Sequence, residues 1–225
     1  MSDGAVNYVW AYEKREENNT LLYDSCPILD YRVRYPRFTK KNSPAHERVN
    51  KYYRKLSDHF IKFCEKKLFP LACEGYQSSI RLCQAPSSFL AMLSCSLTEC
   101  GDGVLSVTVT QNINFGDSRP LVLKSCDLWS ADGYPLELRD IGGGDRSFLK
   151  KLCQNIKKQS DIRNDRAKYP GLKLRRIKQR LKNDKLTLKR DEAGYELFLC
   201  YPELRRNPDD VLSYSCPLSV FEGPQ

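Results

Sequence analysis

The stretch from Val104 to Asp140 alternates between apolar and polar residues in three consecutive segments. In the first segment the apolar residues recur at every second position, with Gln111 as the exception: Leu105, Val107, Val109 and Ile113. A period of two that is rich in β-branched residues is typical of a strand with one buried face. Turn residues separate the segments and predict an antiparallel meander of three strands: 105–114, 121–129 and 134–138.

Helical periodicity appears before and after this meander. Ser43 followed by Pro44 is a good helix start, and the apolar residues behind it step by four, three, four and three: Val49, Tyr53, Leu56, Phe60 and Phe63. This helix is predicted to end near residues 68–70. A second helix is predicted from about Asp145, with four inward residues: Phe148, Leu149, Leu152 and Ile156. A third follows Pro170-Gly171 with three apolar residues on one face: Leu174, Ile177 and Leu181.

The remaining alternating segments predict further strands. They lie at 20–33, at 80–96, on both sides of a turn at 191–194, and at 211–218. Residues 158–169 read as a polar linker. The fold class is therefore α+β: a single domain over residues 20–221, with antiparallel β-meander sheets and helices packed on one side. Residues 1–19 are polar and are expected to form a weakly ordered N-terminal lead-in.

Composition excludes some classes of protein. The chain has 225 residues, 40% of them hydrophobic, and no apolar run approaches the ~18 residues of a membrane span. Its N-terminus lacks the basic start and the apolar core of a signal peptide. As written, the chain is expected to be cytoplasmic, unless it is cut from a longer exported protein.

Positive charge is concentrated in one segment. The formal net charge is +9, but the 25 residues from Arg166 to Arg190 contain eleven Lys or Arg and one acid, so the other 200 residues sum to −1. The exposed arc of the third helix carries the candidate binding residues: Arg175, Arg176, Lys178, Arg180 and Lys182. One interpretation is a solvated helix face. The other is a site for an anionic partner, such as a nucleic acid, a cell-wall polymer or an acidic protein.

Aromatic residues are absent between Leu172 and Arg190, so single-stranded nucleic acid is not the favoured partner. Catalytic signals are weak. No GxSxG, HExxH, P-loop or dinucleotide fingerprint occurs, and the one SxxK, at Ser147–Lys150, lacks its companion motifs. The ten cysteines include no CxxC pair, which leaves reduced structural thiols or some disulfides as the alternatives. We therefore expect no enzyme activity, no cofactor and no metal.

Three segments together resemble a known family: residues 31–38, residues 126–141, and residues 197–204 with 213–218. They are similar to a bacterial domain of unknown function that forms the extracytoplasmic part of the anti-sigma V factor. The same domain stands beside some peptidoglycan deacetylases as a non-catalytic module. The resemblance implies a compact α+β domain with a binding role, which in the anti-sigma factor is the binding of lysozyme.

Two features depart from that family. Residues 115–120 replace its Gly-Gly-Ala-His turn, and the membrane anchor or signal peptide that family members usually follow is not expected in this chain. The basic helix also disfavours a cationic partner such as lysozyme. The expected function is a non-catalytic ligand- or protein-binding module whose partner is an unknown protein or an anionic polymer. The alternative is a nucleic-acid- or anionic-polymer-binding protein that uses residues 172–190. A wall-glycan hydrolase would require a carboxylate cluster.

Overall fold

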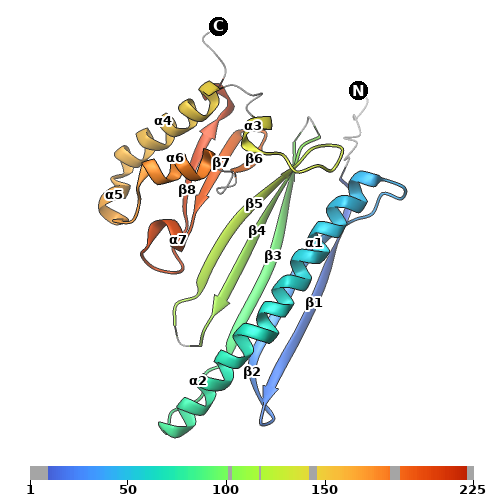
Figure 1. The fold of residues 1–225 in the computed structure, drawn as a ribbon, viewed down its shortest axis with the longest axis vertical. Helices are drawn as coiled ribbons and strands as arrows, with labels where there is room; N and C mark the ends of the chain where they lie inside the picture. Colours follow the sequence, from blue (N-terminus) through green and yellow to red (C-terminus); the bar gives the residue numbers. More distant parts are fainter. Residues whose placement is uncertain (1–9, 101–102, 117, 142–145, 183–187, 222–225) are drawn as a thin grey trace, which may run out of the picture.

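The computed structural model describes residues 10–100, 103–116, 118–141, 146–182 and 188–221. They form one α+β domain with two sheets (Figure 1). The five-stranded sheet has the order β1-β2-β3-β4-β5, with these bounds: Tyr12–Tyr23, Cys26–Phe38, Phe89–Glu99, Leu105–Asn114 and Leu121–Trp129. The three-stranded sheet has the order β6-β7-β8, with these bounds: Leu188–Asp191, Gly194–Leu199 and Leu212–Pro217.

A long helical rod lies along one face of the five-stranded sheet (Figure 1). Helix α1, Pro44–Phe63, starts as predicted, because the Ser43 hydroxyl accepts a hydrogen bond from the His46 amide at 3.4 Å. The rod continues through the π-helical turn Cys64–Leu68 into α2, Phe69–Arg81. The predicted end near residues 68–70 is wrong. The proline there occupies the first turn of α2, the one helical position where a missing N–H is tolerated.

The five-stranded sheet is mixed. Strands β2 and β3 pair in parallel over Leu29–Arg34 and Phe89–Ser94, whereas the other neighbours are antiparallel. The expectation of purely antiparallel sheets is therefore wrong for this pair. Its physical reason is the rod, because a crossover of this length returns the chain to the end of the sheet where β2 began.

Two further expectations are corrected around the sheet. Residues 134–138 form no third meander strand; Pro135 makes a single bridge with Trp129, and the chain then turns into the short helix α3, Leu138–Ile141. The antiparallel meander consists instead of β3, β4 and β5. The 80–96 segment supplies β3, which begins at Phe89.

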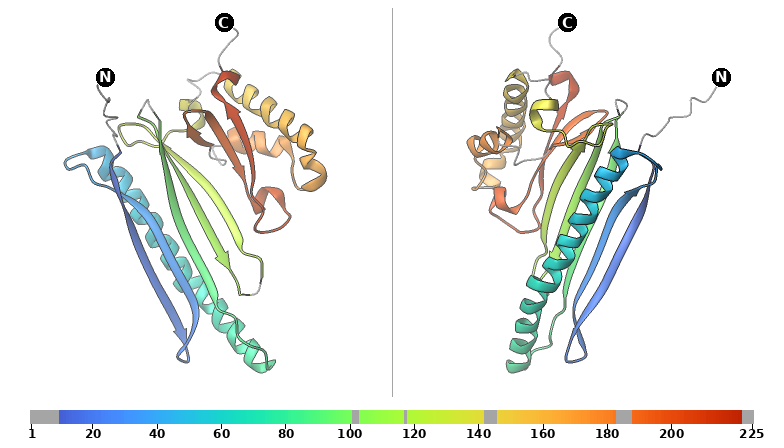
Figure 2. Two further views of the ribbon diagram at one scale, coloured as in Figure 1. Left: turned by 180° about the vertical axis from the view of Figure 1, so that it is seen from behind. Right: turned by 45° about the vertical axis from the view of Figure 1, so that its right-hand side comes forward.

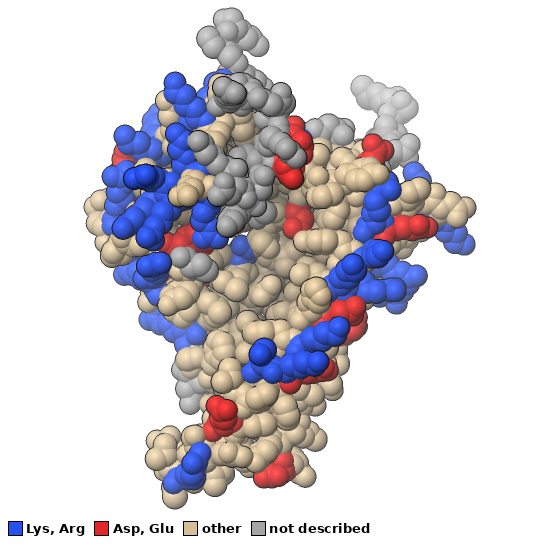
Figure 3. Space-filling view, viewed as in Figure 1, with Lys and Arg blue, Asp and Glu red and all other residues tan. Residues whose placement is uncertain are grey.

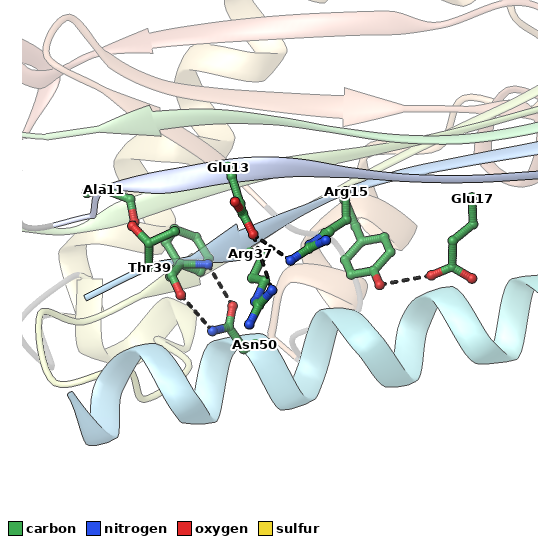
Figure 4. A network of polar contacts seen from close by, with 9 residues as sticks. Ala11, Glu13, Arg15, Glu17, Arg37, Thr39 and Asn50 are labelled. Carbon is green, nitrogen blue, oxygen red and sulfur yellow. Dashed lines mark hydrogen bonds and ion pairs between the residues drawn. The ribbon is translucent and has the colours of Figure 1, made fainter. Parts of the chain in front are cut away.

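Part of the expected lead-in is ordered. Residues 12–19 belong to β1, which pairs with β2 along its whole length, while residues 1–9 lie outside the described part of the chain. Ion pairs and hydrogen bonds link side chains on the two strands. Glu16 pairs with Arg34 at 2.9 Å. Figure 4 shows two further links, Glu13 with Arg37 at 3.3 Å and Glu17 with the Tyr35 hydroxyl at 2.9 Å. Both faces of β1 are exposed, so its sequence lacks the alternation that marks a half-buried strand.

Beyond Arg34 and Ser94 the parallel pair ends, so the inner edge of β2 loses its strand partner there. The side chain of Asn50 on α1 replaces it at Phe38. Its amide oxygen accepts from the Phe38 N–H at 2.8 Å, and its amide nitrogen donates to the Phe38 carbonyl at 2.9 Å (Figure 4). Backbone groups of a buried residue need such partners, and one side chain here satisfies both.

The domain has two hydrophobic cores. One lies between the rod and the five-stranded sheet, and its fully buried residues include Leu29, Tyr53 and Leu93. The second lies between the three-stranded sheet and three helices: α4, Arg146–Arg163; α5, Asp165–Lys168; and α6, Leu174–Lys182. The inward positions Phe148, Leu152 and Ile156 are buried as predicted. Much of the expected linker at 158–169 is helical, in α4 and α5.

Candidate anion-binding face

Helix α6 divides its residues by polarity. Ile177 and Leu181 are buried in the second core and Leu174 packs against it, because positions three and four residues apart share one face of a helix. Three exposed basic residues stand on its outer arc, Arg175, Arg176 and Lys178, and a fourth, Lys173, directly precedes the helix. Figure 3 shows Lys and Arg side chains gathered over the helices α4, α5 and α6 of this unit.

In the part of the chain that the structure describes, no carboxylate lies within ion-pair distance of any of these four cations. Arg180 differs. It is half-buried and forms an ion pair with Glu203 of α7, Tyr201–Leu204, whose side chain is 9% exposed. The second carboxylate oxygen of Glu203 accepts from the Cys200 amide at 3.0 Å, so Arg180 belongs to a structural pair.

Of the five residues predicted from the sequence, Arg175, Arg176 and Lys178 are thus exposed and available. Lys182 is in α6, but its side chain lies outside the described part. The fold adds two exposed cations that the sequence did not group with α6, namely Lys168 of α5 and Arg205 after α7. Together with Lys173 and the three exposed cations of α6 they define what we call the basic face: Lys168, Lys173, Arg175, Arg176, Lys178 and Arg205.

Several acids of this unit are engaged internally. Asp165 is 2% exposed and accepts a hydrogen bond from the Tyr214 hydroxyl at 3.0 Å. Asp161 pairs with Arg166 at 3.7 Å. Engaged carboxylates of this kind add little negative potential to a neighbouring surface, so the field outside α6 is dominated by the basic face.

Two other grooves are not lined by an excess of one charge. The groove between the β1–β2 hairpin and α1 has a volume of about 660 Å³, but both signs of charge line it: Arg15, Arg37, Lys51 and Arg54 against Glu16, Glu17 and Glu47. A second groove of about 320 Å³, between α1 and strands β4 and β5, is lined mainly by apolar side chains such as Phe60, Phe63 and Leu123. Neither groove selects for a ligand of one charge.

A half-buried carboxylate joins α1 to β5. Asp127 accepts hydrogen bonds from the hydroxyls of Tyr52 at 3.2 Å and Tyr53 at 3.1 Å, and the Trp129 indole N–H donates to the Tyr53 hydroxyl at 3.0 Å. Burial raises the pKa of Asp127, although the two hydroxyls oppose the shift. Burial and the Asp127 charge also raise the pKa of Tyr52 to about 12. Strong bonding of this kind anchors the helix to the sheet and leaves the tyrosines protonated.

The cysteines and histidines also have structural surroundings. All ten cysteines are free thiols, and burial raises the pKa of Cys64 and Cys95 to about 12. A thiol with such a pKa is a poor nucleophile. His46 is buried, stacks on Trp10, and accepts a hydrogen bond from the Lys40 amide at 3.1 Å through Nδ1. Within the described segments, no cluster of three or more His, Cys, Asp or Glu side chains could hold a metal ion.

No protein-family model matches the sequence, and no curated protein matches it. Two crystal structures match the fold. One, from Bacteroides fragilis NCTC 9343, is described as a member of the DUF3298 family; it is 12% identical with a TM-score of 0.63, and the match covers 94% of this chain and 92% of that one. The other, a DUF3298 family protein from Pseudomonas aeruginosa PAO1, is 11% identical with a TM-score of 0.55 and the same coverage.

The resemblance drawn from three short segments is thereby confirmed at the level of the fold, which the chain shares with these proteins of unknown function over nearly its whole length. The helices of the described segments include none with the length and hydrophobicity of a bilayer span.

Proposed function

We propose that this chain is a non-catalytic binding module that binds a phosphate-bearing polymer through its basic face. The observation that carries the proposal is the set of six exposed cations on α6 and on the segments around it, with no carboxylate of the described residues paired to them. A polymer of regularly spaced anions releases its counterions when such a surface neutralises it, and this supplies much of its binding free energy.

The contrast with the rest of the molecule supports this choice. On β1 and β2 the arginines are paired with glutamates, as Arg34 is with Glu16 and Arg37 with Glu13. Paired charges of this kind cancel one another at a distance and favour no partner of either sign. A polymer backbone is favoured over nucleic-acid bases because no aromatic residue interrupts the exposed arc of α6, and base recognition in single strands relies on stacking.

The surroundings of the potential nucleophiles support a module without catalysis. Asp127 is held by two tyrosine hydroxyls, and the buried thiols have raised pKa values. Glycoside hydrolysis normally requires two carboxyl groups flanking one bond, whereas Asp165 and Glu203 are each bonded within the fold. A binding role is also what the resemblance drawn from the sequence implied.

The proposal is tested by measuring the fluorescence anisotropy of labelled polyanions over a series of salt concentrations. Poly(glycerol phosphate) and double-stranded DNA serve as probes that share the phosphodiester and differ in everything else. The variant R175A/R176A/K178A removes three charges from the basic face, and R54A/K55A/K62A removes three exposed charges from α1 as the matched control.

We expect the wild-type chain and the α1 variant to bind alike. The α6 variant is expected to bind more weakly, with a salt slope reduced by about 3, since each phosphate contact contributes roughly one unit. Poly(glycerol phosphate) binding without DNA binding would identify a wall-type polymer, and the reverse a nucleic acid. Failure to bind either probe at ~50 mM salt, or equal weakening by both variants, would overturn the proposal.

A further inference from the structure

A small pocket opens on one flank of the basic face, where α6 meets the end of α7. Its volume is about 150 Å³, and its lining comes from two segments of the chain: Gly171, Leu172, Lys173, Arg176, Ile177, Arg180, Glu203 and Arg205. Leu172 and Ile177 are buried and form its apolar floor. Arg176 and Arg180 of α6 and Lys173, which directly precedes the helix, reach it from one side, because residues three and seven positions apart lie on the same side of a helix.

The charges around this pocket do not balance. Glu203 is the one acid in its lining, and it is satisfied by Arg180 and by the Cys200 amide. Lys173, Arg176 and Arg205 have no ion-pair partner among the described residues. A ligand would therefore meet three uncompensated cations, two of them guanidinium groups whose planar forks suit the bidentate binding of phosphate oxygens.

The backbone on the α7 side of the pocket has an unusual conformation. Arg205 has a φ of 50°, in the left-handed region, and its amide donates to the Tyr201 carbonyl at 2.8 Å to close the helix. Glycine or asparagine normally fills such a position. An arginine there is disfavoured, and residues held in sparsely populated backbone regions cluster at ligand-binding sites.

Gly171 allows the two sides of the pocket to approach. A Cβ atom at this position would lie 2.7 Å from the Leu204 carbonyl oxygen and 2.9 Å from the Arg205 Cβ. Any larger residue would therefore push the start of α6 away from the end of α7. The absence of a side chain at Gly171 thus keeps Arg205 opposite Lys173 and Arg176.

The size of the pocket restricts its ligand. Its volume is about five times the share of one water molecule in the liquid, and it is smaller than the ~300 Å³ at which pockets for drug-sized ligands begin. A tetrahedral oxyanion fits such a space, and the three uncompensated cations around it favour an anion over a neutral ligand. We infer that the pocket binds a single phosphoryl group, which makes it the point of closest contact on the surface invoked by the proposed function, on which this inference rests.

Inorganic phosphate is the direct probe, titrated into the full chain at constant low ionic strength and followed by calorimetry or by the arginine and backbone signals of the nuclear magnetic resonance spectrum. The variant K173A/R176A removes two charges from the pocket, whereas R54A/K55A removes two exposed charges from α1 as the matched control. We expect saturable binding by the wild-type chain and by R54A/K55A, and at least a tenfold loss of affinity in K173A/R176A. Equal losses in the two variants, an absence of saturable binding, or an adventitious ion held equally by all the variants would overturn the inference.

The variant Arg205→Gly tests the pocket with a substitution that is not expected to unfold the protein. Glycine is favoured at this φ, so we expect the variant to remain folded while its phosphate affinity falls at least threefold. Unchanged affinity in this variant would count against the pocket. Polymer binding without phosphate binding would refute the pocket and leave the proposed function in place. Phosphate binding without polymer binding would refute the proposed function and leave the phosphate pocket in place.

Discussion

Tyr53→Phe should be among the most destabilising removals of a single atom in this protein. The Tyr53 ring is fully buried, and its hydroxyl accepts from the Trp129 indole at 3.0 Å and donates to Asp127 at 3.1 Å. Trp129 is only 4% exposed, so without the Tyr53 hydroxyl its indole N–H has no partner. An unsatisfied buried donor of this kind costs about 1–3 kcal/mol. The Asp127 carboxylate, a charged acceptor, also loses the hydrogen bond that the Tyr53 hydroxyl donates to it, which is worth about 1.5–3 kcal/mol.

The two losses arise from one atom and overlap, so we expect the free energy of unfolding to fall by about 3 kcal/mol. The chain supplies its own control next to this residue. Tyr52→Phe removes the same atom from the same carboxylate, with a 3.2 Å bond, but Tyr52 is 41% exposed and water can replace its hydroxyl. Its cost should be about 0.5–1 kcal/mol.

Urea unfolding followed by tryptophan fluorescence measures both variants, and the comparison holds when the denaturant slopes of the variants agree. The larger loss of unfolding free energy expected for Tyr53→Phe comes from the burial of its hydroxyl and from the Trp129 indole that donates to it. Equal losses in the two variants, or a larger loss in Tyr52→Phe, would show that the Asp127 bonds alone determine the energy and would refute this prediction.

Three more outcomes are expected. Burial raises the pKa of Asp127 in the folded state, so the protonated carboxyl stabilises the fold below the unfolded-state pKa, and this stability is lost as the pH rises through the folded-state pKa. Unfolding measured from pH 3.5 to 7 should therefore show that Asp127→Asn costs less stability at the higher pH. Cys83 is exposed whereas the pKa of Cys64 and of Cys95 is about 12, so a thiol-reactive dye should show a fast phase at neutral pH that Cys83→Ser removes. Gly194 has a φ of 150°, and a Cβ atom added there would overlap the Cys216 carbonyl oxygen of β8, so Gly194→Ala should lose about 3 kcal/mol by thermal unfolding.

Local sequence signals predicted the elements that bury one face. The strand β4, the Ser43-Pro44 start of α1 and the apolar face of α6 all match the structure. The expectation that β4 buries only one face is wrong for its first half, where Ser106 and Thr108 are buried as well. In each case the information lies within a few residues, because a cap, a turn or an amphipathic face is a local property. The exposure of Arg175, Arg176 and Lys178 follows directly from the position of that apolar face.

Features that depend on distant partners were not predicted. Strand β1 is exposed on both faces and is held by β2, so its own residues carry no periodic signal. The parallel pairing of β2 with β3 depends on the rod between them, whose length the Pro70 position disguised. The proposed site shows the same division: the ion pair of Arg180 with Glu203 and the approach of Arg205 to Gly171 join residues more than twenty positions apart.

The junction between the two sheets explains how the basic face is presented. The Arg190 amide donates to the Ser106 hydroxyl at 3.1 Å, the Lys124 amide to the Cys200 sulfur at 3.1 Å, and the Val122 amide to the Pro208 carbonyl at 2.9 Å. These bonds fix the three-stranded sheet against β4 and β5, with α4 and α6 on its far side (Figure 2). The cations therefore project away from the five-stranded sheet, and a long ligand can lie across them without requiring the two parts of the domain to move apart.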